Sequence, residues 1–215
     1  MRQSILHTLR TYPWRQQLLC LLPSLLLLCG LAAFIGTGND VTLCFKACET
    51  QDPFMTRIVR FFTDWTNFAF YLVYAVLFAV GLFGKNKSLI RFVLVFAAVQ
   101  ILISSLLVQG TKIAVGRPRP VPAFKGFSYM PFSLKGAFHS FPSGHTAEIS
   151  GAASSLANRY RQPLLSLLLG LIVALVGFSR IYLCMHHISD VAGGLVFGVF
   201  VGLLVHHLCR PKNQA

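Results

Sequence analysis

The chain has 215 residues, of which 55% are hydrophobic and only 12% are charged. A soluble domain of this size carries about 25% charged residues, so the composition excludes an ordinary soluble protein and predicts one membrane-embedded domain over residues 1–215. The net charge of +13 is compatible with nucleic acid as a binding partner. However, the basic residues form no solvated run with interleaved aromatics, and lie instead at the ends of apolar segments, where anionic lipid head groups explain them better.

The first apolar segment follows a basic leader, residues 1–17, which contains three arginines, no acid, and an aromatic pair at Tyr12 and Trp14. Such a leader is typical of the cytoplasmic side of a first membrane span. We expect residues 18–35 to form that span, since a bilayer crossing needs about 20 residues. A cleaved signal peptide is the alternative. The long apolar run and the poor small-x-small pattern favour a retained anchor.

Two further spans are predicted at residues 68–83 and 90–108. Before them, residues 57–65 (RIVRFFTDW) are typical of a short amphipathic helix that lies along the membrane interface. Cys44 and Cys48 lie in the same outer segment. They can pair in an oxidising compartment, although i,i+4 spacing on a regular helix is poor disulfide geometry, so both states stay open.

We expect the chain to stay outside the membrane from Lys112 to Phe141, in a loop rich in Pro, Phe and Gly. A loop of this length is often functional, so it is either a lid over a site or a connector on the bilayer surface. The fourth span, residues 146–157, is rich in small residues and contains Glu148. This composition suits a helix in the centre of a bundle, where backbones approach closely.

Spans at residues 164–180 and 191–207 complete six transmembrane helices, so the predicted fold class is all-α, polytopic membrane protein. Six spans place the N-terminus, the 84–91 turn, the 158–163 turn and the C-terminal tail on one side. These pieces contain ten Lys or Arg and no acid, which is typical of the cytoplasmic side. We therefore expect an integral protein of the cytoplasmic (inner) membrane with both termini in the cytoplasm.

Three polar stretches face the opposite side: residues 112–120 (KIAVGRPRP), 141–145 (FPSGH) and 179–190 (SRIYLCMHHISD). On a helix His186 and Asp190 are i and i+4, so the carboxylate can hold one ring nitrogen and leave the other free as a nucleophile. Taken alone, this stretch is explained equally well as a satisfied interfacial polar cluster.

Read in order, the stretches give K-x6-R-P, P-S-G-H and S-R-x5-H-x3-D. This pattern resembles the type 2 phosphatidic acid phosphatase (PAP2) superfamily of acid phosphatases and lipid phosphate phosphatases, and it covers roughly the C-terminal half of the chain. The matching residues are Lys112, Arg119, Pro120, Pro142, Ser143, Gly144, His145, Ser179, Arg180, His186 and Asp190.

The resemblance implies a PAP2-type helical bundle and a two-step reaction. His186 attacks phosphorus to give a phosphohistidine and is oriented by Asp190. His145 protonates the departing oxygen and then activates water. No metal and no other cofactor is implied, because the sequence offers no carboxylate cluster for magnesium and cationic side chains replace it.

The same resemblance assigns substrate phosphate binding to Lys112, Arg119 and Arg180, whose positive charges match the phosphoryl oxygens. Ser143 and Gly144 precede the fourth helix, so a hydroxyl and backbone amides at a helix N-terminus can face the anion.

Other polar residues lie outside the pattern. Arg117 and Glu148 are candidates for the rim of the site or for positions behind it. His187 points about 100° away from His186 on a helix, and we interpret it as structural or interfacial.

The predicted activity is hydrolysis of a lipid phosphomonoester or diphosphate, of the undecaprenyl diphosphate or lipid A phosphate type, at the periplasmic or outer face. A lipid phosphotransferase using the same intermediate, and a non-catalytic lipid transporter or anion-binding protein, are the alternatives. The expected partners are a phosphorylated lipid substrate and membrane lipids, without nucleic acid. The sequence leaves the oligomeric state open.

Overall fold

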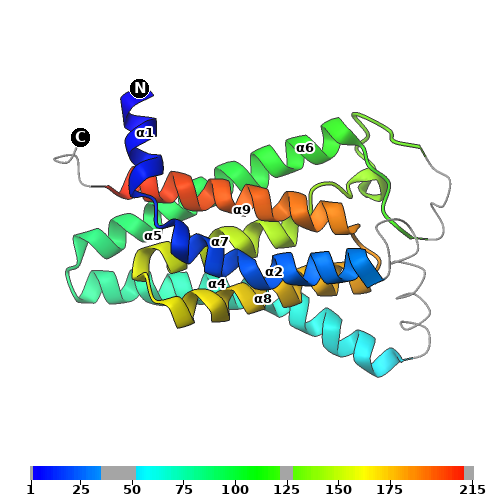
Figure 1. Ribbon diagram of the computed structural model, residues 1–215, viewed down its shortest axis with the longest axis horizontal. Coiled ribbons are helices and arrows are strands. Elements are labelled where there is room, and N and C mark those ends of the chain that lie inside the picture. The colour runs from blue at the N-terminus through cyan, green and yellow to red at the C-terminus, as the bar shows by residue number, and fades with distance from the viewer. Residues whose placement is uncertain (1, 35–51, 122–127, 211–215) are drawn as a thin grey trace.

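The computed structural model describes residues 2–34, 52–121 and 128–210, and within them every regular element is a helix (Figure 1). Cys44, Cys48 and part of the 112–141 loop lie outside the described residues. In chain order the elements are α1 (Arg2–Thr11), α2 (Trp14–Phe34), α4 (Pro53–Phe83), α5 (Lys87–Gln100), the π-helical segment η1 (Ile101–Leu107), α6 (Val108–Val115), the short 3-10 helix η3 (Gly136–Phe138), α7 (Gly144–Tyr160), α8 (Pro163–Tyr182) and α9 (Ile188–Cys209). The all-α prediction is confirmed.

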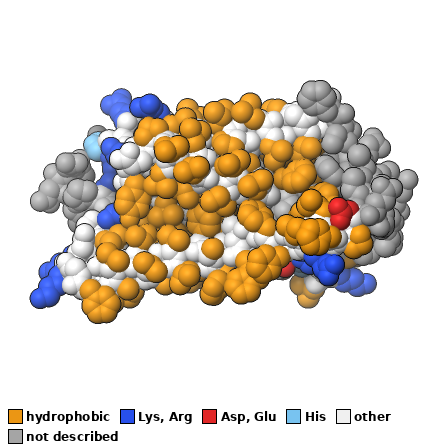
Figure 2. All heavy atoms as spheres, turned by 90° about the horizontal axis from the view of Figure 1, so that it is seen from below, with side chains coloured by type: hydrophobic (Ala, Val, Ile, Leu, Met, Phe, Trp, Pro, Cys, Tyr) orange, Lys and Arg blue, Asp and Glu red, His pale blue; other side chains and the backbone are white. Residues whose placement is uncertain are grey.

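Apolar side chains cover the lateral surface of the bundle, whereas Lys and Arg gather toward its two ends (Figure 2). This is the distribution expected of a protein whose middle faces lipid. Five helical segments within the described ranges are long and apolar enough to cross a membrane: Trp14–Ala33, Pro53–Phe83, Lys87–Val115, Pro163–Tyr182 and Ile188–Cys209. The prediction of a polytopic membrane protein is confirmed.

The fourth predicted span is α7, which is too short and too polar to be counted with those five. Its main neighbours are α9, α8 and α2, and 12 of its 17 residues are buried. Because other helices surround α7, its serines and its glutamate do not have to face lipid. Its small residues let those helices pack closely against it, as the sequence indicated.

The closest of these contacts joins α7 to α9 at Gly198. A Cβ added there would lie 2.9 Å from the backbone nitrogen of Gly151 and closer still to the Ser150 side chain. We expect Gly198→Ala to lower the free energy of unfolding by about 1–3 kcal/mol, because the methyl group forces the two helices apart. Thermal unfolding in detergent measures this. Gly30→Ala in α2, where a Cβ meets nothing within 4 Å, is the matched control, and equal shifts for both variants would contradict the account.

The prediction of a separate interfacial helix at residues 57–65 is wrong. These residues belong to α4, one helix of 31 residues that begins after the N-cap Asp52, with Pro53 in its first turn. No proline or glycine follows before Gly81, so nothing in the sequence breaks the helix. The N-terminal part of α4 projects beyond the neighbouring helices (Figure 1).

The third span also runs further than predicted. It was expected to end near Gly110, but the helix continues through η1 and α6 to Val115. A glycine within a helix costs only about 1 kcal/mol, which the surrounding turns outweigh. The helix ends instead at Gly116, whose left-handed φ of 59° closes its last turn. Lys112 therefore lies in the last turn of a rigid helix and not in a loop.

The described chain ends and the α4–α5 and α7–α8 turns lie at one end of the bundle, and the three motif stretches lie at the other (Figure 1). Antiparallel helices joined in series produce this arrangement. It brings residues far apart in sequence to the N-terminus of α7.

Candidate active site

The predicted site residues come from four parts of the fold that meet at this end of the bundle. Lys112 lies at the end of α6, and Arg119 lies in the segment that follows it. His145 is in the first turn of α7, Arg180 is in the last turn of α8, and His186 is in the turn before α9. His145 has the other four as electrostatic neighbours.

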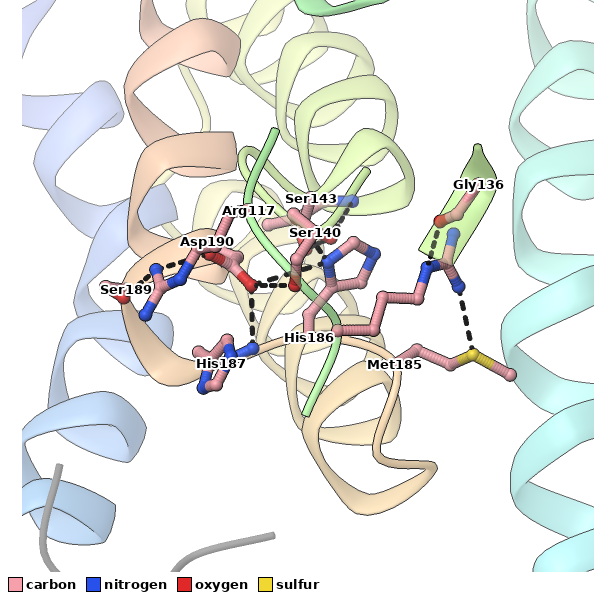
Figure 3. Close-up of polar contacts among 11 residues, drawn as sticks. Arg117, Gly136, Ser140, Ser143, Met185, His186, His187, Ser189 and Asp190 are labelled. Atoms are coloured by element: carbon pink, nitrogen blue, oxygen red, sulfur yellow. Dashed lines mark hydrogen bonds and ion pairs between the residues drawn. The ribbon is translucent and has the colours of Figure 1, made fainter. Parts of the chain in front are cut away.

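The His186 ring is held in one tautomer. It is 2% exposed, and its Nδ1 lies 2.7 Å from the backbone carbonyl oxygen of Ser140 (Figure 3). A carbonyl oxygen only accepts, so Nδ1 carries the hydrogen and Nε2 keeps its lone pair. Burial lowers the pKa of His186 to about 4, so the ring is neutral near neutral pH. A neutral imidazole with a free Nε2 has the form that a nucleophile requires.

Asp190 differs from the expected geometry. Its Oδ2 lies 3.7 Å from His186 Nδ1, close enough for electrostatic attraction but too long for a hydrogen bond. The reason is that α9 begins at Ile188, so His186 precedes the helix and i,i+4 helical spacing does not apply. The direct acceptor for the imidazole is the Ser140 carbonyl.

Asp190 instead joins the three motif stretches to one another. It is fully buried and accepts hydrogen bonds from Arg117 Nη1 at 2.6 Å, from Ser140 Oγ at 2.5 Å and from the His187 backbone N–H at 2.8 Å (Figure 3). Its own carbonyl accepts from the Ser143 backbone N–H at 2.9 Å. Arg117 therefore lies behind the site as the partner of this carboxylate, and His187 is the N-cap of α9.

Ser140 is the functional residue that sequence reasoning missed. It is fully buried, and it contacts the imidazole through its carbonyl and Asp190 through its hydroxyl. The only signal in the sequence was its position directly before FPSGH. Every residue has a backbone carbonyl, so the residue type does not show which one orients the His186 ring.

Three cationic or titratable side chains around the α7 N-terminus have no hydrogen bond or ion pair with any described residue: Lys112, His145 and Arg180. Arg180 is only 7% exposed, and its Nε is buried without a partner. Among the described residues, the Arg119 guanidinium donates to two neutral groups, the Gly136 carbonyl oxygen at 3.1 Å and the Met185 sulfur at 3.1 Å. A buried charge without a partner is costly. The N-terminus of α7 is therefore surrounded by positive charge that the described residues do not pair.

The first turn of α7 faces the same place. Lys112 Nζ lies beside Gly144, so that a Cβ on this glycine would be 3.0 Å from the ammonium nitrogen. The first amides of a helix have no intrahelical acceptor and bind anions readily. Ser143 is fully buried, and its hydroxyl serves as the N-cap of α7, accepting from the Thr146 hydroxyl at 2.9 Å.

Glu148 lies one turn further along α7. Its carboxylate accepts a hydrogen bond from Asn67 Nδ2 of α4. It therefore faces the α4 side of the site and makes no hydrogen bond to either catalytic candidate histidine.

The fold and the site together are those of a polytopic helical membrane protein with a cationic site at one end. We call the group of Lys112, Arg119 and Arg180 around the N-terminus of α7 the cationic cup. Sequence comparison matches residues 88–214 to the PAP2 superfamily. The chain belongs to the PAP2 superfamily.

Curated relatives with several names are similar to the chain. Lipid A 1-phosphatase from Rhizobium johnstonii is 37% identical over 109 residues, which is 48% of this chain and 43% of that protein. Undecaprenyl-diphosphatase BcrC from Bacillus subtilis is 30% identical over 73% of this chain and 78% of its own length. Phosphatidylglycerophosphatase B from Bacillus subtilis is 28% identical over 81% and 87%. The match thus spans less than half the length of the lipid A phosphatase. No solved structure matches the chain.

Proposed function

We propose that the protein is a metal-independent lipid phosphate phosphatase that hydrolyses a phosphomonoester or diphosphate head group through a phosphohistidine at His186. One observation carries this proposal. The buried Arg180 guanidinium and the Lys112 ammonium, which make no hydrogen bond or ion pair with any described residue, lie around two histidines, and the His186 ring donates from Nδ1 to Ser140 and so keeps the lone pair on Nε2. A phosphoryl group supplies the missing negative charge and the electrophile at the same place.

In the first step His186 Nε2 attacks phosphorus, and the bond from phosphorus to the departing oxygen breaks. His145 donates a proton to that oxygen, which leaves as the dephosphorylated lipid or lipid monophosphate. In the second step His145 takes a proton from water, the resulting hydroxide attacks phosphorus, and the N–P bond breaks to release inorganic phosphate. The transition state spreads charge over the equatorial oxygens, where Lys112, Arg119 and Arg180 stabilise it.

An amphiphilic substrate fits the surroundings of the site. A groove of about 420 Å³ lies between α4 and α5, and its walls are mostly apolar, with Glu148 among its lining residues. An acyl or prenyl chain can occupy such a groove while the head group reaches the cationic cup. The names of the relatives support undecaprenyl diphosphate, a lipid A phosphate or phosphatidylglycerophosphate as the substrate class.

The proposal includes the orientation of the protein in the cytoplasmic membrane. The basic chain ends and turns lie in the cytoplasm, and the site opens at head-group depth on the periplasmic or outer face.

Phosphate release from a panel of lipid phosphates, assayed with purified protein and excess chelator, tests the proposal. We expect turnover of at least one prenyl diphosphate or lipid A phosphate, unchanged by the chelator, because the charge that stabilises the transition state comes from side chains. Loss of activity that added magnesium restores would contradict it. Transfer of the phosphoryl group to a lipid acceptor without free phosphate would identify a phosphotransferase instead.

A further inference from the structure

A second cationic cavity lies at the opposite end of the bundle from the active site. Its volume is about 400 Å³. It is formed where α1, the end of α7 and the end of α9 meet. The lining residues used below are Thr11, Arg159, Arg161, His206 and Arg210.

Three arginines share this one cavity, and no described carboxylate forms an ion pair with any of them. None of the six acidic residues of the chain lies between residues 149 and 189 or after Asp190. A general excess of positive charge at this end accounts for exposed loop residues such as Lys85 and Lys87. It does not account for three arginines that line the same cavity.

Two of the arginines are held in place by neutral partners. The Arg159 guanidinium stacks on the Phe92 ring, 4.6 Å from its centroid. Arg210 donates from Nη1 to the Thr8 hydroxyl at 3.3 Å, and its Nη2 contacts Thr11, the His7 ring and the His7 carbonyl oxygen of α1, which leaves Nε and one Nη1 hydrogen without a described acceptor. These contacts hold the two guanidinium groups in place but leave their positive charge unpaired. Their remaining N–H donors are therefore available to an anion. Arg161 follows the end of α7 and is exposed.

The cavity also lies beside the start of the first helix that is long and apolar enough to cross a membrane. Trp14, the first residue of that span, is exposed, as is typical of aromatic residues at the membrane–water boundary, and it packs edge to face 4.7 Å from the buried Tyr12 ring. Tyr12 in turn contacts the ring of His206, which lines the cavity, at 5.4 Å. The cavity is therefore close to the end of a membrane-spanning helix, where lipid phosphates are expected.

We infer that this cavity binds the phosphate of an anionic membrane lipid, at a site separate from the catalytic one. Basic pockets between membrane helices recognise anionic head groups in this way. The shared chemistry is a phosphate held by guanidinium forks, which free inorganic phosphate also offers, so the test must distinguish the two sources.

The test compares two triple variants that remove the same charge from the same end of the protein. Arg159→Gln/Arg161→Gln/Arg210→Gln empties the cavity of charge. Arg15→Gln/Lys85→Gln/Lys87→Gln is the control, because these side chains are exposed and lie outside the cavity. Both variants keep the active site, so any difference in lipid binding between them is due to the arginines of the cavity.

Thermal stabilisation of the detergent-purified proteins by phosphatidylglycerol gives an apparent Kd, with phosphatidylcholine as the neutral lipid and inorganic phosphate as the free anion. We expect the cavity variant to bind phosphatidylglycerol roughly a hundredfold more weakly and the control to change by less than about threefold, from about 1 kcal/mol per basic residue. A cavity-dependent response to inorganic phosphate as well would support the site and show that the phosphate alone is sufficient.

Equal losses in the two triple variants, or no stabilisation of the unaltered protein by either anion, would overturn the inference. If the triple cavity variant fails to fold, the single variant Arg161→Gln is measured in its place. Arg161 is exposed and its side chain has no described partner, so this substitution should leave the fold intact. It is expected to weaken phosphatidylglycerol binding roughly fivefold, and an unchanged apparent Kd would overturn the inference.

Discussion

His186→Asn is expected to abolish phosphate release, with kcat reduced by roughly 10⁴-fold or more, as when other enzymes lose their nucleophile. Asparagine can still donate to the Ser140 carbonyl from its amide nitrogen, so the packing around Asp190 is retained. It has no atom equivalent to Nε2, the one nitrogen of the ring that is left free by the 2.7 Å hydrogen bond from Nδ1 to Ser140. The measurement is phosphate release from the lipid that the unaltered protein turns over fastest.

Binding provides the control for this variant. The cationic cup is unaltered in His186→Asn, so inorganic phosphate is expected to stabilise the variant about as well as the original protein. Residual turnover above roughly 1% in a folded variant would show that another group makes the bond to phosphorus.

Arg180→Met and Arg117→Met are expected to change stability in opposite directions although each removes one arginine from the same end of the bundle. Arg180 is buried and makes no hydrogen bond or ion pair with any described residue. Replacing it with an apolar side chain should therefore raise the free energy of unfolding by about 1–3 kcal/mol in the absence of phosphate. Arg117 pairs with Asp190, which is fully buried. Its loss leaves that carboxylate without its cation and should cost about 2 kcal/mol or more.

Activity should fall in both variants for different reasons. Arg180→Met removes a group that stabilises the transition-state charge and should lower kcat/KM by roughly 10²–10³-fold, together with the stabilisation given by added phosphate. Arg117→Met acts through Asp190 and Ser140 and should retain the response to phosphate. Thermal unfolding with and without phosphate separates the two effects. A destabilised Arg180→Met protein would contradict the view that this residue awaits an anion.

The helical bundle could be predicted from the sequence because long apolar segments identify membrane-spanning helices. The position of α7 at the centre followed from its small residues, although it lacks the apolar length of the other spans. The extended α4 was missed because amphipathic character near residues 57–65 suggests an interfacial helix, whereas helix continuity depends on the absence of a break before Gly81. The end of α6 was missed because Gly110 is only a weak helix breaker.

The site was predictable in its side chains but not in its backbone. The residue types and their order identified the histidines and the cations. The roles of Ser140 and Arg117 depend on how the turn between α8 and α9 places Asp190, which lies 2.6 Å from Arg117 and 3.7 Å from the His186 ring. The spacing of residues in the sequence does not show whether Asp190 pairs with Arg117 or with the His186 ring, because the same aspartate serves in both cases.

Trapping the covalent intermediate tests directly whether His186 forms the bond to phosphorus. His145→Ala protein can neither protonate the departing oxygen nor activate water. It is mixed with a substrate that carries a labelled phosphoryl group and a leaving group acidic enough to depart unprotonated, and is then denatured and digested. We expect a label bound through nitrogen, labile in acid and stable in alkali, on the peptide that contains His186. A label on another residue, or phosphate released by the unaltered protein with no protein-bound label in either form, would contradict it.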